Sequence, residues 1–155
     1  MEERPLPQYA ALTAAFWGIF GGFLVVGRDR IPERIGFGDL TRIALSTYKI
    51  SRVITKDEIA AFIRAPVTED AAAQEPKKEG MAAAVGALVT CPYCVGLWIS
   101  ASLSYSYVFF PRETRFATTI FSAHGLTDFL NAAFVRLREG PATSLPQQPS
   151  DQGDV

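Results

Sequence analysis

The chain has 155 residues, a formal net charge of −1 and a mean hydropathy of +0.13, values that would also suit one ordinary soluble domain. It contains no Walker loop, no GxGxxG and no nucleophile elbow, so nothing supports a kinase, a nucleotide-binding protein or a hydrolase. Its basic residues form no separate nucleic-acid-binding motif.

The first apolar segment runs from Tyr9 to Val26 without a charged side chain. The head before it, residues 1–8, has two Glu and one Arg where a secretion signal would be basic, and Arg-Asp-Arg follows in place of a small-residue cleavage site. The pattern favours an uncleaved transmembrane helix over residues 9–27. Gly18 and Gly22 form a GxxxG pair, a weak indication of close helix contact in lipid.

Residues 28–66 form a basic region with two predicted helices. From Asp39 to Val53 apolar residues recur at helical spacing, and basic side chains gather on another side. The apolar set is Leu40, Ile43, Ala44, Thr47, Ile50 and Ile54, and the basic set is Arg42, Lys49, Arg52 and Lys56. Thr55 and Glu58 have capping-box spacing and predict a second, short helix that ends at Pro66.

Two environments suit these helices. They could lie on the anionic inner leaflet of a membrane, or they could present a solvated basic face while packing against transmembrane helices. Both interpretations make the region cytoplasmic. Residues 67–80 and 140–155 have no apolar period, which predicts a flexible linker and a disordered tail, and neither is expected to carry chemistry.

The longest apolar segment extends from Met81 to Phe110, thirty residues without a charged side chain. A bilayer crossing needs only about 20. Pro92 lies within it, and because proline is disfavoured inside a helix and favoured in the first turn, we expect a new helix to begin there. The segment 81–135 then contains an interfacial or re-entrant helix, a span starting in the CPYC motif, and the last transmembrane helix.

Cys91 and Cys94 lie at this predicted helix start, where the backbone dipole favours a thiolate. Three interpretations stay open. The pair could be redox active, with Cys91 as nucleophile and Cys94 as resolving thiol, although no strand precedes it as in glutaredoxins, which share the tetrapeptide. It could bind a metal, but with His124 it supplies only three of the four ligands of a structural zinc site. It could be structural, since small polarizable side chains suit a helix break.

The third apolar run, Phe116 to Val135, contains His124 and Asp128, and with Asn131 these polar residues share one face of the predicted helix. Ionisable groups in a span usually face the bundle interior and indicate either a functional site or a partnered structural charge.

The structural alternative is an ion pair between this helix and the basic region. Asp128 and Asn131 would pair with Lys49, Arg52 or Arg64, and we expect Arg52 and Arg64 in particular to pair with Asp57 or Asp128.

The predicted fold is therefore all-α: an integral membrane protein of one domain, with about three transmembrane helices plus cytoplasmic amphipathic helices. Ten of the 15 Lys and Arg residues lie between Arg28 and Gly80, and basic residues near spans stay on the cytoplasmic side. This places the N-terminus outside, residues 28–80 inside, the PRETR turn outside and the C-terminus inside.

Several of these segments together resemble a known family. They are ALSTYKISRVITKDEIAAFIRAPV, LVTCPYCVGLW, PRETR and TDFL, and they are similar to the bacterial domain-of-unknown-function family numbered 1360, small membrane proteins with a basic segment ahead of a C-P-[YW]-C-x-G-x-W motif. The resemblance covers roughly Asp39 to Asn131. The matching positions are Lys49, Ser51, Arg52, Asp57, Arg64, Pro66, Cys91, Pro92, Cys94, Gly96, Trp98, Arg115 and Asp128. The resemblance implies a membrane protein and implies no activity.

We therefore expect a non-enzymatic structural or interaction protein of the bacterial inner membrane. A thiol-disulfide oxidoreductase using Cys91 and Cys94 is the alternative, and a metal-binding membrane protein is the second alternative. The expected partners are the bilayer, anionic lipid headgroups and a second copy of the chain, with no nucleic acid, no cofactor and no assigned metal ligands.

Overall fold

The computed structural model describes residues 6–70, 75–77 and 80–139, and this part of the chain is all-α, as predicted, apart from one pair of short strands. The helices are α1 (Leu6–Gly27), α2 (Phe37–Lys56), α3 (Ala61–Arg64), α4 (Gly80–Thr90), α5 (Pro92–Phe109) and α6 (Pro111–Glu139). The 3-10 turns are η1 (Arg28–Arg30) and η2 (Glu58–Ala60). Three residues of the predicted head belong to α1, and residues 1–5 and the predicted tail lie outside the described residues.

Prolines begin two of the helices. α5 starts at Pro92, as predicted, with Cys91 in an extended conformation as its N-cap, and α6 starts at Pro111 directly after Phe110. The axes of α4 and α5 differ by 82°. The charge-free stretch from Met81 to Phe110 is therefore two helices meeting at a sharp break, because Pro92 cannot donate the hydrogen bond that would continue α4.

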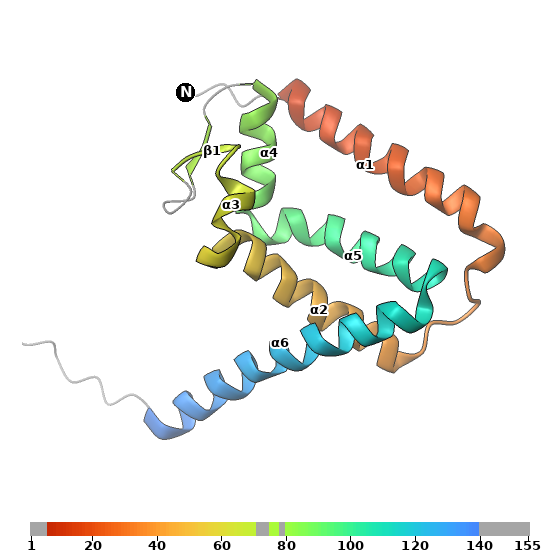
Figure 1. Ribbon diagram of the computed structural model, residues 1–155, viewed down its shortest axis with the longest axis vertical. Coiled ribbons are helices and arrows are strands. Elements are labelled where there is room, and N and C mark those ends of the chain that lie inside the picture. The colour runs from red at the N-terminus through yellow and green to blue at the C-terminus, as the bar shows by residue number, and fades with distance from the viewer. Residues whose placement is uncertain (1–5, 71–74, 78–79, 140–155) are drawn as a thin grey trace, which may run out of the picture.

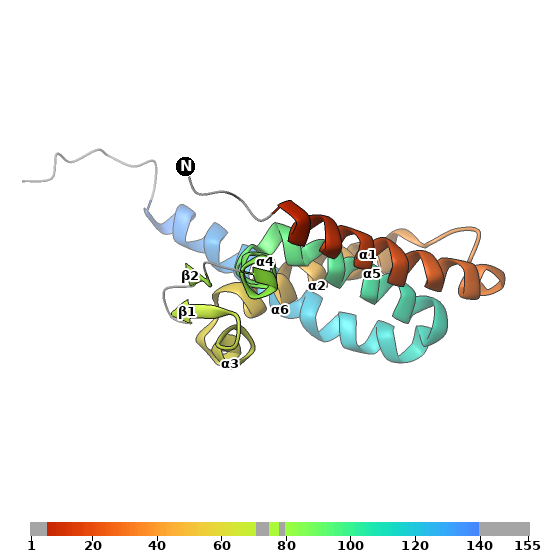
Figure 2. The same ribbon diagram turned by 90° about the horizontal axis from the view of Figure 1, so that it is seen from above.

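α5 lies between α1 and α2 (Figure 1). Against α1 it runs parallel, since Phe16 in the middle of α1 contacts Trp98 in the first half of α5, and Phe23 contacts Phe109 near the ends of both helices. The ring centroids of these pairs are 5.3 and 6.2 Å apart. Figure 2 shows the same helices from above, with α4 seen almost end on.

α2 runs antiparallel to α5 and parallel to α6. At one end of α2, Asp39 accepts a hydrogen bond from the hydroxyl of Tyr107 near the end of α5. Towards its other end, Ser51 lies against Gly96 in the second turn of α5. Along α6, the Ser46 hydroxyl donates to the carbonyl oxygen of Thr118 at 2.8 Å. These three helices make the most extensive contacts among the described elements and form the centre of the fold.

The predicted membrane topology is contradicted by this arrangement. Asp39 was expected inside and Arg115 outside, yet the Arg115 guanidinium donates two hydrogen bonds to the Asp39 carboxylate, at 2.9 and 3.2 Å. The two residues are neighbours, so a membrane around this fold could not place all of residues 28–66 opposite the PRETR turn. The prediction failed because it took the charges of α2 as topological signals, whereas Arg42 and Lys49 pair with carboxylates of the bundle.

The contact surfaces of the bundle consist mainly of small and polar side chains. On α6 the buried residues recur at three- and four-residue intervals: Thr114, Thr118, Ser122 and Gly125. A Cβ added to Gly125 would lie 3.2 Å from the carbonyl oxygen of Leu45, so the backbones of α6 and α2 approach closely. Small residues at such spacing are typical of helix contacts in membranes.

Large apolar side chains, in contrast, point outward. On α1 the exposed fraction is 69% for Trp17 and 76% for Val26, and on α6 it is 72% for Phe116. Soluble monomers rarely expose contiguous apolar surface of this kind, so another apolar medium or molecule is needed to cover it.

Membrane-spanning candidates are fewer than the three predicted. Among the described residues, one helix is long and apolar enough to cross a bilayer, α1 with η1 (Leu6–Arg30), and α4 with α5 makes a second if the bent pair is one span. α6, which contains the third predicted span, does not qualify, because His124, Asp128 and Asn131 lie within its apolar run and lower the hydropathy of that run. A signal sequence, or the core helix of a soluble protein, can be equally long and apolar. A core helix is mostly buried, however, whereas only 11% of the apolar 18-residue stretch of α1 is buried.

The connection from α2 to α4 also differs from its prediction. Thr55 is a buried residue within α2, and its hydroxyl donates to the Ser51 carbonyl oxygen, so it does not form the predicted capping box with Glu58. The short helix predicted up to Pro66 is η2 followed by α3. In the predicted linker, β1 (Thr68–Asp70) pairs antiparallel with β2 (Glu75–Pro76) beside α4, and residues 71–74 and 78–79 lie outside the described residues.

Candidate functional site

The two cysteines lie at the break between α4 and α5. Cys91 is the N-cap of α5, and its sulfur accepts a hydrogen bond from the backbone N–H of Cys94 at 3.3 Å. Both cysteines are free thiols, Cys91 half-buried and Cys94 exposed. Cys91 is thus the sulfur whose thiolate form the local hydrogen bond stabilises, a geometry that suits thiol chemistry at a helix start.

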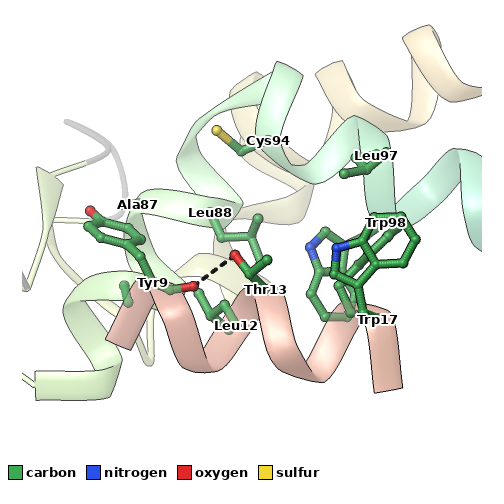
Figure 3. A pocket seen from close by; sticks show the side chains of 11 residues that line it. Tyr9, Leu12, Thr13, Trp17, Ala87, Leu88, Cys94, Leu97 and Trp98 are labelled. Carbon is green, nitrogen blue, oxygen red and sulfur yellow. Dashed lines mark hydrogen bonds between the residues drawn. The ribbon is translucent and has the colours of Figure 1, made fainter. Parts of the chain in front are cut away.

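Cys94 lines a cavity of about 310 Å³ between α1, α4 and α5 (Figure 3). Thr13 and Trp17 of α1 contribute to its wall, as do Leu88 of α4 and Trp98 of α5. None of the described residues that line it carries a charge. The break at Pro92 therefore sets a thiol at the edge of an uncharged, aromatic cavity.

Asp128 has a partner from the basic region, and that partner is Lys49. Lys49 Nζ donates to Asp128 Oδ2 at 2.9 Å, between the middle of α2 and the middle of α6. The Lys49 side chain is 10% exposed and the Asp128 side chain 36%. Lys49 was one of the three basic residues considered for this contact, and its alkyl chain is long enough to lie along the interface.

Arg64 contacts Asp57, one of its two predicted partners, through the backbone carbonyl of that residue. Arg64 is almost fully buried, and its Nη1 donates to the carbonyl oxygens of Ile54 and Asp57, at 2.7 and 3.1 Å. It therefore stabilises the carboxyl end of α2, where carbonyl groups have no helical partner. Arg52 lies over the ring of Tyr48, 5.9 Å from its centroid.

His124, Asp128 and Asn131 do not converge on one site. Asp128 faces α2, whereas His124 and Asn131 are exposed. Within the described ranges, no three His, Cys, Asp or Glu side chains are grouped so that they could hold a metal ion.

A cluster around Asp39 was missed by the sequence analysis. Its carboxylate accepts hydrogen bonds from Tyr107 at 2.7 Å, from Arg42 at 2.8 Å and from Arg115. The Tyr107 hydroxyl and the Arg115 guanidinium hold the pKa of Asp39 below its ordinary value of 3.8. The cluster ties together the beginnings of α2 and α6 and the end of α5. Only the Asp39–Arg42 contact is local; Tyr107 and Arg115 are 68 and 76 residues from Asp39, so no local sequence pattern predicts the cluster.

The Lys49–Asp128 contact can be tested by comparing single and double substitutions. Lys49→Met leaves Asp128 half-buried without its cation, so the free energy of unfolding in detergent should fall by about 1–3 kcal/mol. The double variant Lys49→Met with Asp128→Asn removes both charges and should recover part of that loss. Denaturant titration of the four proteins gives the coupling energy, and strictly additive losses would contradict a direct pair.

The Asp39 cluster predicts a pH dependence. Since its folded pKa is lowered, the stability that Asp39 contributes is fully present above the ordinary value of 3.8 and is lost as the pH falls through the folded pKa. Wild-type protein should melt at a higher temperature than Asp39→Asn at pH 6, and the difference should shrink as the pH is lowered below 3.8. Asp29→Asn is the matched control, because the Asp29 side chain is 93% exposed. A pH-independent difference would refute the assignment.

Comparison with known proteins places the chain in a family. The family model described as "Protein of unknown function (DUF1360)" matches residues 42–134, which include most of α2, the CPYC motif and most of α6 but not α1. The UPF0713 protein YngL of Bacillus subtilis (strain 168) is 27% identical over 85 residues, 52% of this chain and 65% of that relative. No solved structure matches. Since the family model covers more than half of the 155 residues, the chain belongs to the DUF1360 family, as its resemblance predicted.

Proposed function

We propose that this protein is an integral protein of the bacterial inner membrane with a structural or interaction role. The observation that carries the proposal is the low burial of α1: its most apolar 18-residue window is 11% buried, whereas a core helix of a soluble protein is mostly buried. Lipid would remove from water the exposed side chains of this helix, such as Trp17 and Val26.

The composition of the helix contacts supports the same environment. Ser46, Thr118 and Ser122 are buried between helices while Phe116 and Phe134 are exposed, the reverse of the usual soluble core. In lipid, apolar side chains gain nothing by turning inward, so close packing and hydrogen bonds between small polar residues associate the helices.

The helix directions then imply a topology. α2 and α6 run antiparallel to α5 and alongside it. Neither qualifies as a span by its own hydropathy, so in this proposal both cross the bilayer only as partners of α5, at the same depth. α1 runs in the same direction as α5. Both ends of the described chain and the α3–α4 region are then on one side of the membrane. Residues 31–36 and the PRETR turn are on the other.

Cysteine labelling tests this topology. In a background with Cys91→Ser and Cys94→Ser, single cysteines replace Glu33, Lys77, Glu113 or Arg138, and intact and permeabilised cells are treated with an impermeant maleimide. The Glu33 and Glu113 positions should react from one side and the Lys77 and Arg138 positions from the other. Labelling of the Glu33 and Lys77 positions from the same side would overturn the topology. Recovery of the protein as a soluble monomer without detergent would overturn the membrane assignment itself.

A second candidate function, thiol-disulfide exchange, is favoured by the hydrogen bond at the α5 start. Cys91 Sγ accepts from the backbone N–H of Cys94 at 3.3 Å, an arrangement that suits Cys91 as nucleophile and Cys94 as resolving thiol. A reducing cytoplasm permits such a pair as a transient, catalytic disulfide.

Alkylation trapping in cells tests this candidate. Cells are quenched with acid and their free thiols are then alkylated. A fraction of the protein should resist alkylation because Cys91 and Cys94 are joined in a disulfide, and that fraction should rise after addition of diamide. Cys91→Ser and Cys94→Ser are the controls, and each should abolish the intramolecular disulfide. A wild-type pair that stays reduced even under diamide would eliminate the redox function.

A further inference from the structure

We propose that the cavity between α1, α4 and α5 binds a membrane quinone, which accepts electrons from the Cys91–Cys94 dithiol. The inference deepens the second candidate function and rests on it. Cys94 is the link, since it lines the cavity and its backbone N–H donates to the Cys91 sulfur at 3.3 Å.

The cavity wall limits the chemistry of an occupant. Aromatic rings of Tyr9, Phe16, Trp17 and Trp98 contribute to it, and no charged side chain does among the described lining residues. A nucleotide or flavin nucleotide would bring phosphate groups that need cations or a ring of N–H donors. A neutral, flat and apolar molecule has no such need, and aromatic walls favour stacking against its ring.

The size and position of the cavity agree with this class of ligand. A volume of about 310 Å³ is at the lower end of the range for small-molecule sites and accommodates a substituted six-membered ring. The cavity lies between α1 and the bent α4–α5 pair, the two elements of the described chain that qualify as membrane spans (Figure 3). An apolar ligand dissolved in the bilayer could therefore enter without crossing water.

The reaction balances without another reactant. The two thiols lose two protons and two electrons in forming the Cys91–Cys94 sulfur–sulfur bond, and the quinone takes up both to become the hydroquinone. Cys94, which lines the cavity, adds through its sulfur to a carbonyl carbon of the quinone, and its thiol proton goes to the carbonyl oxygen. The Cys91 thiolate then attacks the Cys94 sulfur, so the sulfur–sulfur bond forms as the carbon–sulfur bond breaks. The ring leaves with that electron pair as the hydroquinone anion, which takes up the proton that Cys91 released. Cys91 is the N-cap of α5 and Cys94 its third residue, the positions at which CxxC motifs form disulfides at helix starts.

The test uses the full-length protein in detergent, reduced and kept free of oxygen, with tetramethylbenzoquinone as the probe. A fully substituted ring leaves no open position for a thiol to add, so loss of thiols reports oxidation. One hydroquinone should form for every two thiols lost. Ala87→Phe, which fills the cavity from α4, should slow the reaction about tenfold, an effect of about 1.4 kcal/mol on the barrier. Ala123→Phe, on the exposed face of α6, is the matched control and should react at the wild-type rate.

Diamide separates the possible failures. If diamide forms the disulfide in wild-type protein but the quinone does not, or if Ala87→Phe reacts with the quinone as fast as wild type, the quinone site is refuted while the thiol function stands. If neither oxidant forms the disulfide, the thiol function fails and the quinone site fails with it. Diamide oxidation of Ala87→Phe establishes that the variant has kept the thiol pair together.

Discussion

The close approach of α2 to α5 and α6 is the contact on which the rest of the structure depends. It requires small side chains on all three helices, and Gly96, Gly125 and Thr118 lie where larger residues would separate the backbones. At these distances hydroxyls reach the carbonyl groups of a neighbouring helix, as Ser46 reaches Thr118. Dispersion and hydrogen bonds between small residues, more than burial of large apolar groups, therefore associate these helices.

The polar character of the interface explains how charged residues are tolerated there. Lys49 and Asp128 satisfy one another between α2 and α6, and the Asp39 carboxylate accepts hydrogen bonds from three neighbours where helices end. Arg64 binds carbonyl groups at the carboxyl end of α2. An ionic group in an apolar surrounding is costly unless it is partnered, so these contacts also specify which helices pair and in which register.

The break before Pro92 connects this scaffold to chemistry. A continuous helix through residues 81–110 would leave no N-cap for a cysteine. Because the chain turns by 82°, Cys91 takes the N-cap position and Cys94 lies beside the cavity under α1. The family model matches α4 and α5 but not α1. The cavity is therefore lined by two helices of the matched region and by one helix outside it.

Local sequence was sufficient for the helical class, for the new helix at Pro92 and for the family, because proline geometry, charge-free length and the CPYC octet are local properties. It was insufficient for the membrane topology and for the ion pairs. α2 looks cytoplasmic from its charges alone, and only its position beside α5 and α6 shows that Lys49 faces Asp128, 79 residues away. The sequence analysis did not single out Thr114, Thr118 and Ser122, which the structure buries against neighbouring helices. Tertiary packing decides which helices meet and in which direction, because the same small and charged residues could face solvent, lipid or another helix.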